Sequence, residues 1–313
     1  MSEQHPEAPS DSSAATDVAR EQVGYLGPAG TFTEEALLAS AREGAVEPVA
    51  LASIYDTVMA LRRGEVRWAV APIENSLEGS ISVTLDLLAE EVGDLEIVGE
   101  TLLRVSHALI CARACALREI DTVITHPQVP GQCTRFLRTE LEHARILPAS
   151  STAEAVRAVV AEDEPGRAAI GTALAASIYG GTVVRERIED RDDNETRFVW
   201  LRAAGVADGV APLRVEDGAA WKTSVVFWGA GAERPGWLVR CLDEFARREI
   251  NLTKIESRPR RQWLGSYMFF ADLLGRADDA PVAAAIAGVR AVCEEVRVLG
   301  TYAAARPAAA RRP

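Results

Sequence analysis

Long hydrophobic runs are missing from this sequence. Even the most apolar stretches, such as residues 149–160, are interrupted by Ser, Thr, Glu and Arg, and none approaches the roughly 18 residues of a membrane-spanning helix. The first 20 residues are acidic and have no apolar core, which is unlike a secretory signal or an Arg-rich transit peptide. We therefore expect residues 1–20 to be a disordered tail, and the protein to be cytoplasmic with no membrane contact.

Cysteines are few and unpatterned, and an excess of basic charge is absent. The five cysteines are scattered without a CxxC or Cys/His cluster, which favours free thiols and indicates no metal site. The formal net charge is -12, which argues against nucleic acid as a partner. An anionic substrate would then need positive charge placed locally, which draws attention to Arg197.

Short apolar runs alternate with helical patterns over residues 21–202, and this alternation predicts parallel α/β sheets. We expect two lobes, the first made of residues 21–103 and 189–202 and the second of residues 104–188. Residues 95–111 indicate a long strand pair or a crossover between the lobes. A cleft between two such lobes is a usual place for a ligand.

The composition changes after residue 202. Residues 203–220 are rich in Gly, Ala, Pro and Asp without a period and are predicted to be a linker. Residues 221–302 then give the order βαββαβ, which indicates a ferredoxin-like sandwich. Residues 303–313 consist mostly of Ala, Arg and Pro and are expected to be disordered.

A glycine-rich turn, Gly27–Thr33, joins the first predicted strand to a helix. Backbone N–H groups at such a helix start suit an anion, with Thr31 adding a hydroxyl. The alternative is an ordinary turn with a threonine cap, which is favoured because single glycine turns are common.

Polar residues follow the buried strand that ends near Ala71. Asn75 offers a donor and an acceptor, and Ser76 and Ser80 offer hydroxyls. The ends of central strands are where α/β folds place function, although a simple loop with Ser80 as a helix cap explains the pattern equally well.

A second strand end carries Thr125 and His126, with Gln132 following. His126 has the chemistry of a general base, but a histidine held by local hydrogen bonds is the favoured reading. His107 lies within an apolar strand and is expected to be a core histidine.

The segment Asn194–Phe198 enters a strand at the point where the chain returns between the lobes. The Arg197 guanidinium has the planar fork that binds carboxylates. The alternative is an Asp/Asn turn before a strand. In the last unit, a Gly opening a helix at 236 and an Arg-Pro ending a strand at 259 could bracket a small zwitterion, or simply be a capped helix and an edge strand ended by proline.

The motifs together carry a resemblance. Gly-Pro-x-Gly-Thr-Phe, Pro-Ile-Glu-Asn-Ser, Thr-Arg-Phe and Glu-Ser-Arg-Pro occur in this order between residues 23 and 302. This combination resembles the prephenate dehydratase family with a C-terminal ACT regulatory domain. The resemblance implies an α/β fold with a bilobal catalytic domain like type II periplasmic-binding proteins, followed by a ferredoxin-like ACT domain at residues 221–302.

The resemblance also implies an activity: decarboxylating dehydration of prephenate to phenylpyruvate, water and carbon dioxide on the route to L-phenylalanine, with no cofactor and no metal. It implies allosteric regulation by L-phenylalanine and a homodimer or homotetramer formed through ACT domains. The alternatives are an arogenate dehydratase and a non-catalytic amino-acid sensor. A fused chorismate mutase is disfavoured, because only about 20 residues precede the first strand.

Site roles carried over from the family fall into three groups. The expected catalytic residues are Thr196, Asn75, Glu74, Gln132 and Thr125. The expected substrate-binding residues are Arg197, Phe198, Thr31, Ser76, Gly79 and Ser80. The expected effector-binding residues are Gly236, Trp237, Leu238, Glu256, Ser257, Arg258 and Pro259.

Three finer expectations follow. Trp237 stands where the family usually has alanine, so the indole is expected to reshape the effector pocket. Thr125 stands where many relatives have serine, which keeps the hydroxyl. Arg197 is expected to hold the pyruvyl carboxylate of the substrate, because a carboxylate that leaves as neutral carbon dioxide gains little from an ion pair.

Overall fold

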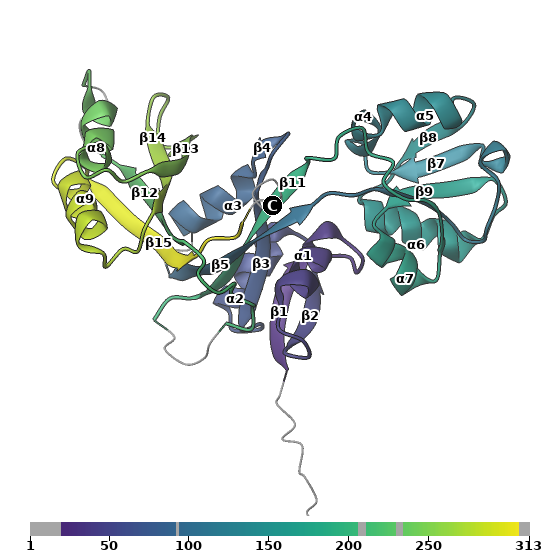
Figure 1. Cartoon of the computed structure of the whole chain (residues 1–313), viewed down its shortest axis with the longest axis horizontal. Coiled ribbons are helices and arrows are strands. Elements are labelled where there is room, and N and C mark those ends of the chain that lie inside the picture. Colours follow the sequence, from purple (N-terminus) through teal and green to yellow (C-terminus); the bar gives the residue numbers. More distant parts are fainter. Residues whose placement is uncertain (1–19, 92–93, 206–210, 230–233, 307–313) are drawn as a thin grey trace, which may run out of the picture.

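The computed structural model describes residues 20–91, 94–205, 211–229 and 234–306. Three bodies lie in a row, with a C-terminal unit at one end, a first lobe in the middle and a second lobe at the other end (Figure 1). Most of both predicted tails and the middle of the predicted linker lie outside the described residues.

The first lobe (lobe 1) is a sheet with strand order β2-β1-β3-β11-β5, to which the short β4 adds beside β3. β1 pairs in parallel with β2 and β3, whereas β11 is antiparallel to both β3 and β5. The strands are β1 Glu21–Leu26, β2 Val46–Leu51, β3 Trp68–Asn75, β4 Gly79–Ser80, β5 Leu95–Arg104 and β11 Glu195–Ala203.

The helices of lobe 1 begin where the sequence supplies caps. The Thr31 and Ser53 side chains each accept a hydrogen bond from the backbone N–H three residues on, which satisfies one free donor of the first turn. The helices are α1 Phe32–Ser40, α2 Ile54–Arg62, α3 Ser82–Asp86 and a π-helical turn Leu87–Glu91.

The second lobe (lobe 2) has strand order β10-β6-β9-β7-β8. The strands are β6 Ala108–Cys111, β7 Thr122–Thr125, β8 Arg145–Pro148, β9 Arg167–Gly171 and β10 Thr182–Arg185. The helices are α4 Val129–Gln132, α5 Thr134–Glu140, α6 Thr152–Glu162 and α7 Ala173–Tyr179, with a 3-10 turn at Leu117–Glu119. The α6 helix is capped in the same way as α1 and α2, since the Ser151 side chain accepts from the Glu154 N–H.

Two chain crossings join the lobes. Residues 95–111 divide into β5 of lobe 1 and β6 of lobe 2, so the crossover reading of this segment is confirmed. The chain returns after β10 and enters β11 at Glu195. Thr196 and Arg197 are both paired within this strand, so the alternative of an Asp/Asn turn applies only to the residues before Glu195.

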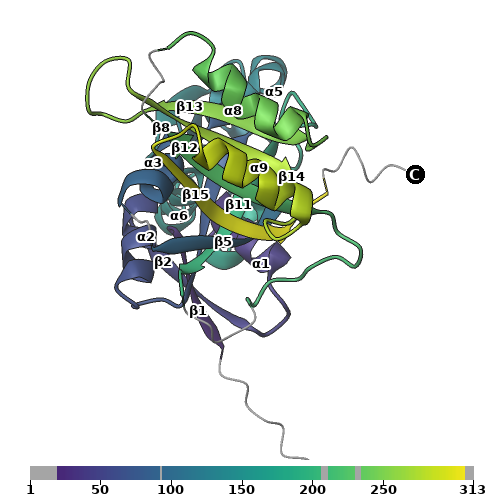
Figure 2. The ribbon, with the colours of Figure 1, turned by 90° about the vertical axis from the view of Figure 1, so that its left-hand side faces the viewer.

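The C-terminal unit has the predicted βαββαβ order and a sheet of order β13-β14-β12-β15. Its elements are β12 Trp221–Trp228, α8 Trp237–Ala246, β13 Leu252–Pro259, β14 Tyr267–Leu274, α9 Ala280–Arg290 and β15 Glu295–Ala303. The two helices cover one face of this sheet (Figure 2). The other face packs on lobe 1, where Phe270, Leu299 and Tyr302 share one hydrophobic cluster with Ile97 and Leu88.

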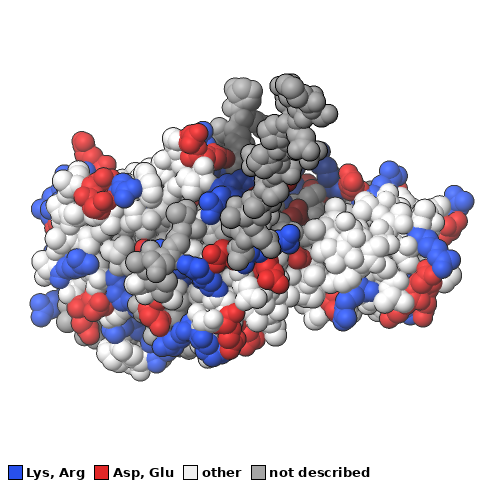
Figure 3. Space-filling view, turned by 90° about the horizontal axis from the view of Figure 1, so that it is seen from below, with Lys and Arg blue, Asp and Glu red and all other residues white. Residues whose placement is uncertain are grey.

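Part of the predicted linker is fastened to lobe 1. Leu213 packs against the cluster that contains Phe198 and Trp200 and forms an isolated bridge with Ala41. Basic and acidic side chains are interspersed over the face seen in Figure 3. In the described part of the chain, no helix has both the length and the apolar character needed to cross a membrane.

Candidate functional site

A pair of polar side chains marks the end of the central strands of lobe 1. The register of β3 and β11 places Asn75 opposite Thr196. The Asn75 Nδ2 donates to Thr196 Oγ1 at 2.9 Å and to Asn194 Oδ1 at 2.8 Å. The Asn75 Oδ1 accepts from the backbone N–H groups of Leu77 and Glu78, at 2.9 and 3.0 Å. The amide is therefore held in one orientation by bonds at both of its ends.

This orientation decides what the Thr196 hydroxyl can do. A hydroxyl has one proton to donate and two lone pairs that accept. Because the Asn75 amide donates to Thr196 Oγ1, one lone pair is occupied and the proton remains available for another acceptor. Thr196 thus offers a hydrogen-bond donor at the edge of lobe 1.

Lobe 2 faces this edge with two glutamines. The Glu78 carboxylate, in the loop after Asn75, accepts from Gln128 Nε2 at 3.1 Å and from Gln132 Nε2 at 3.0 Å. Gln128 precedes α4 of lobe 2 and Gln132 is its last residue, so these two bonds cross between the lobes. Gln132 is thereby placed on the side of lobe 2 that faces the Asn75 loop.

His107 fixes the orientation of Gln132, a role that the sequence reading as a core histidine missed. His107 Nε2 lies 2.9 Å from Gln132 Oε1. Since an amide oxygen only accepts, Nε2 must carry the proton. Among the described residues, the buried His107 Nδ1 has no hydrogen-bond partner. Burial lowers the pKa of this imidazole against the opposing effects of Gln132 and Glu189. A neutral His107 therefore directs the Gln132 NH2 group towards lobe 1.

The remaining predicted residues near the cleft have mainly local partners. The Thr125 hydroxyl is buried and donates to the Ile170 carbonyl at 2.9 Å. Thr31 caps α1 and donates to the Leu26 carbonyl. Ser76 accepts from the Glu195 N–H at 3.0 Å. These local contacts give the three hydroxyls structural roles and leave direct substrate contact by them unsupported.

Two further predicted residues are structural as well. Gly79 has a positive φ of 83°, which favours glycine in the turn between β3 and β4. Phe198 is buried in the core of lobe 1 beside Tyr25 and Leu37, so its ring does not line the cleft. In each case the backbone position, rather than the side chain, contributes to the site.

Arg197 lies on the opposite face of β11 from Thr196, because successive residues of a strand point to opposite sides. Its Nε contacts Glu100 Oε2 at 2.6 Å, its Nη1 contacts Asp272 Oδ2 at 2.5 Å, and its Nη2 donates to Tyr302 Oη at 2.8 Å. Burial opposes the charge, but Tyr302, Asp272 and Glu100 together raise the pKa of this guanidinium. The expectation that Arg197 grips the substrate is therefore wrong in this arrangement.

Glu74 faces the same way, for the same reason. It is paired with Arg197 across the two strands, and its carboxylate lies 3.0 Å from Lys254 Nζ and 3.5 Å from Arg197 Nη1. The predicted catalytic role of this side chain is not supported, because its carboxylate points towards the C-terminal unit and away from the Asn75–Thr196 pair.

The Glu-Ser-Arg-Pro motif divides between the two faces of β13. Glu256 accepts from the Ser80 hydroxyl at 2.9 Å, and Arg258 forms a bidentate pair with Asp86 at 2.9 and 3.0 Å. Both contacts reach lobe 1, so Ser80 belongs to this interface and not to the substrate cleft. Ser257 and Pro259 are exposed and point away from lobe 1.

Trp237, which was expected to reshape the effector pocket, lies in the core of the C-terminal unit. The indole is buried against Phe227 and Phe269, and its Nε1 donates to the Val292 carbonyl at 2.8 Å. It fills the core of the C-terminal unit next to Leu238, while Gly236 begins α8 with φ 80°. The Trp237 ring therefore occupies part of the hydrophobic core of this unit.

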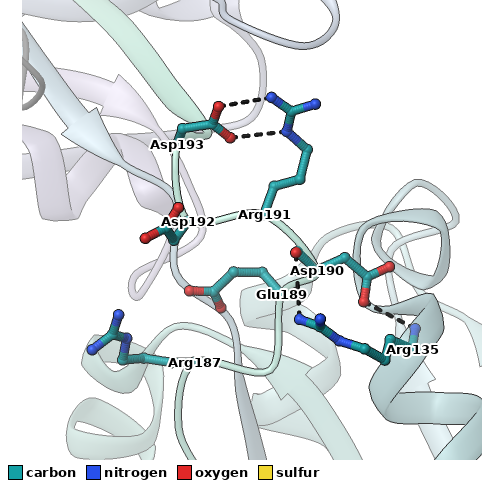
Figure 4. Close-up of a pocket in the computed structure, with 7 residues that line it drawn as sticks. All are labelled: Arg135, Arg187, Glu189, Asp190, Arg191, Asp192 and Asp193. Carbon is teal, nitrogen blue, oxygen red and sulfur yellow. Dashed lines mark hydrogen bonds and ion pairs between the residues drawn. The ribbon is translucent and has the colours of Figure 1, made fainter.

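A separate hollow lies where the chain returns from lobe 2 (Figure 4). All of its lining side chains are charged: Arg135, Arg187, Glu189, Asp190, Arg191, Asp192 and Asp193. Arg191 and Asp193 point at each other and form a bidentate pair (Figure 4). The lining has four carboxylates and three arginines, so it is slightly acidic, and Thr196 is not part of it.

Within the described ranges, no group of three or more His, Cys, Asp or Glu residues could hold a metal ion. The site defined by the geometry is thus a set of hydroxyl and amide groups at the facing edges of the two lobes of an α/β protein, followed by a βαββαβ unit.

Comparisons with known proteins agree with this combination. A family model for prephenate dehydratase matches residues 23–205, which is more than half of the chain. A prephenate dehydratase from Mycolicibacterium vanbaalenii is 37% identical over 295 residues, covering 90% of each chain. One from Amycolatopsis methanolica is 38% identical over 294 residues, covering 92% of this chain and 90% of the relative. The chain belongs to the prephenate dehydratase family.

Solved structures extend the likeness over both lobes and the C-terminal unit. The prephenate dehydratase of Arthrobacter aurescens in complex with L-Phe has a TM-score of 0.79 at 36% identity, covering 92% of each chain. A protein described as GqqA, a novel type of quorum-quenching acylase, has a TM-score of 0.78 at 26% identity, covering 90% of this chain and 98% of that one. The fold alone therefore does not separate these two activities.

Proposed function

We propose that the cleft beside Asn75 and Thr196 converts prephenate to phenylpyruvate, with Thr196 as the hydrogen-bond donor to the departing hydroxyl. The observation that carries this assignment is the 2.9 Å bond from Asn75 Nδ2 to Thr196 Oγ1. It occupies an acceptor site of the hydroxyl and leaves its proton free for the substrate.

The reaction explains why a neutral donor suffices. The ring carboxylate leaves as carbon dioxide, its electron pair becomes part of the aromatic ring, and the ring hydroxyl departs and takes up one proton to become water. Aromatisation drives these steps, so the enzyme needs to stabilise negative charge on the departing oxygen. Preorganised donors aimed at developing charge contribute roughly 10²–10³-fold.

Gln132 is proposed to bind a substrate carboxylate from lobe 2. Its NH2 group is directed at the cleft by His107 and now donates to the Glu78 carboxylate. A carboxylate of the prephenate dianion is the same kind of acceptor as the Glu78 carboxylate. It can therefore replace Glu78 as the acceptor for the Gln132 NH2 group. This assignment replaces Arg197 as the group that recognises the anion.

The test compares Thr196→Val with Thr196→Ser, because valine keeps the shape and serine keeps the hydroxyl. We expect Thr196→Val to lose roughly 10²-fold or more in kcat, with a smaller change in KM and an unchanged melting temperature. Thr196→Ser should retain most of the activity. A folded Thr196→Val variant with normal kcat would remove Thr196 from the reaction.

The same assay separates the alternatives. Phenylpyruvate formation from prephenate should exceed turnover of arogenate, and an acylase assay should be negative. The likeness to GqqA makes the acylase control necessary. A protein that changes conformation with amino acids but forms no phenylpyruvate would be a sensor.

The C-terminal unit is proposed to be an ACT regulatory domain that binds L-phenylalanine, with the bilobal part resembling type II periplasmic-binding proteins. Support comes from its βαββαβ order and from the Arthrobacter aurescens relative, which was solved with L-Phe. Gly236, Leu238, Ser257 and Pro259 remain the proposed effector contacts. We also propose a cytoplasmic homodimer or homotetramer formed through these units, which sedimentation analysis with and without L-phenylalanine would test.

A further inference from the structure

A cluster of six charged side chains lies between lobe 1 and the C-terminal unit. Ion pairs of 2.5–3.5 Å connect all six members. The members are the cations Arg197, Lys222 and Lys254 and the carboxylates Glu74, Glu100 and Asp272. The three positive and three negative charges balance, so the cluster is neutral as a whole.

The cluster touches the candidate active site through the backbone. Glu74 and Arg197 are opposite each other on β3 and β11, and the next pair along the same register is Asn75 and Thr196. The first pair faces the C-terminal unit and the second faces the cleft, because side chains alternate along a strand. Each interface charge is therefore the immediate sequence neighbour of a group proposed for catalysis.

The C-terminal unit reaches these two strands from two of its own. Lys254 on β13 contacts Glu74 at 3.0 Å and donates to the Ser80 hydroxyl at 2.7 Å. Asp272 on β14 contacts Arg197 at 2.5 Å. Burial works against the charge of Asp272, but Arg197, Ser224 and Lys222 together lower the pKa of its carboxyl. The Arg197–Asp272 contact is buried and the Lys254 contacts are partly buried, so together they hold the strands of the two bodies in one relative position.

We propose that this cluster positions Asn75 and Thr196, and that it is the route by which the C-terminal unit controls the reaction. Lys254 and Asp272 are positioning residues that act through Glu74 and Arg197. A shift of β13 or β14 relative to lobe 1 moves both strands and so misaligns the Asn75–Thr196 hydrogen bond. Misplacement by about 1 Å can cost on the order of 10²-fold in rate.

The two-faced arrangement of β13 fits this role. Lys254, Glu256 and Arg258 point at lobe 1, whereas Ile255 and Ser257 are exposed on the other side of the same strand. A ligand that binds the exposed side of β13 therefore acts on the same backbone that carries the lobe 1 contacts. The regulatory half of this inference rests on the proposed regulation by L-phenylalanine.

The test uses Lys254→Met, which removes the charge but keeps an unbranched side chain, and Lys254→Arg, which restores the charge. The matched control is Arg261→Met, which removes another cation that contacts lobe 1, at Asp86, outside the cluster. The measurements are thermal unfolding, kcat and KM for phenylpyruvate formation, the Kd of L-phenylalanine, and the change of kcat/KM caused by L-phenylalanine.

We expect folded Lys254→Met to lose roughly tenfold or more in kcat at nearly constant KM, with recovery in Lys254→Arg. The factor by which L-phenylalanine changes kcat/KM should fall about fivefold or more while its Kd stays near the wild-type value. Arg261→Met should match the wild type in every measurement. If Lys254→Met does not fold, Glu74→Gln, which leaves the shape of the partner intact, replaces it with the same expectations.

The outcomes separate the two proposals. Wild-type kcat and wild-type response to L-phenylalanine in folded Lys254→Met would overturn the positioning role. A wild-type enzyme that does not respond to L-phenylalanine would overturn the proposed regulation alone, and the kcat of Lys254→Met would still decide whether the cluster positions the site.

Discussion

The two interfaces of lobe 1 are built differently. Towards the C-terminal unit, lobe 1 shares a hydrophobic cluster that includes Ile97 and Phe270, and a buried, balanced set of charges lies beside it. Towards lobe 2, the cores are separate, and the contacts are mainly polar. Besides the Glu78 bonds, Thr172 donates to the Gly30 carbonyl at 2.7 Å and Tyr179 to the Ala29 carbonyl at 2.8 Å.

The difference separates a rigid contact from one that can open. Separating lobe 1 from the C-terminal unit would expose apolar surface and unpaired charges to water, which is costly. Separating the lobes exchanges a few hydrogen bonds, of which the Glu78 pair is exposed and the Thr172 bond is buried, for bonds to water, which costs less than exposing a shared core. We therefore expect lobe 1 and the C-terminal unit to move as one body, and lobe 2 to move relative to them when substrate enters. Four changes test this comparison.

Arg197→Met should have the largest effect on stability. It leaves Glu100 and Asp272 buried without their shared cation, which typically costs about 3–5 kcal/mol. Denaturant unfolding measures the loss. Arg191→Met, which breaks an exposed pair with Asp193, is the control and should change little. Near-normal stability with a raised KM would instead return Arg197 to the substrate-binding role.

Gly300→Ala should weaken the interface between lobe 1 and the C-terminal unit, because the added methyl group has no space there. A Cβ at residue 300 would lie 2.0 Å from the Ile97 carbonyl oxygen, so β15 would have to move away from β5. Such overpacking costs about 1–3 kcal/mol. Gly131→Ala is the control, since a Cβ there meets nothing within 4 Å. Equal stability of the two variants would show that this contact is not tight in solution.

Glu78→Gln should act on the polar interface, and mainly on substrate affinity. It removes a negative charge that competes with the substrate dianion for Gln132, and a charge at contact distance contributes about 1 kcal/mol in water. We expect KM for prephenate to fall a few-fold while the unfolding free energy stays close to that of the wild type. A raised KM would mean that Glu78 closes the cleft without competing.

Mild acid should have the smallest effect, on lobe 2 alone. Because burial lowers the pKa of His107 in the folded protein, the unfolded chain binds a proton more readily below its ordinary pKa of about 6.5. Stability should therefore decline as the pH falls from about 6.5 towards the folded pKa. His107→Gln, which retains a donor for Gln132, should reduce this dependence. Identical pH profiles for the two proteins would contradict it.

The sequence predicted the helices and strands well. It did not predict on which side of a strand each side chain lies. The helix start after Gly236 and the order of all six elements of the C-terminal unit could be predicted from the sequence. The residues around Thr196 were also recognised as belonging together. Their side chains were not assigned correctly, because Arg197 and Glu74 are one position away from Thr196 and Asn75 and so lie on the other side of the sheet.

Family motifs and local patterns, carried by adjacent residues, were enough to determine the enzyme class and the βαββαβ order, and they singled out Thr196 for the proposed catalytic role. Only the tertiary structure decided whether each motif residue contacts lobe 1, lobe 2 or the C-terminal unit. Strand register set Asn75 against Thr196, and the packing of a third body turned Arg197 from an expected anion receptor into the centre of a buried charge cluster. The physical reason is that a charge pairs with the opposite charge that is nearest in space. The distance along the sequence does not reveal that Asp272 lies beside Arg197.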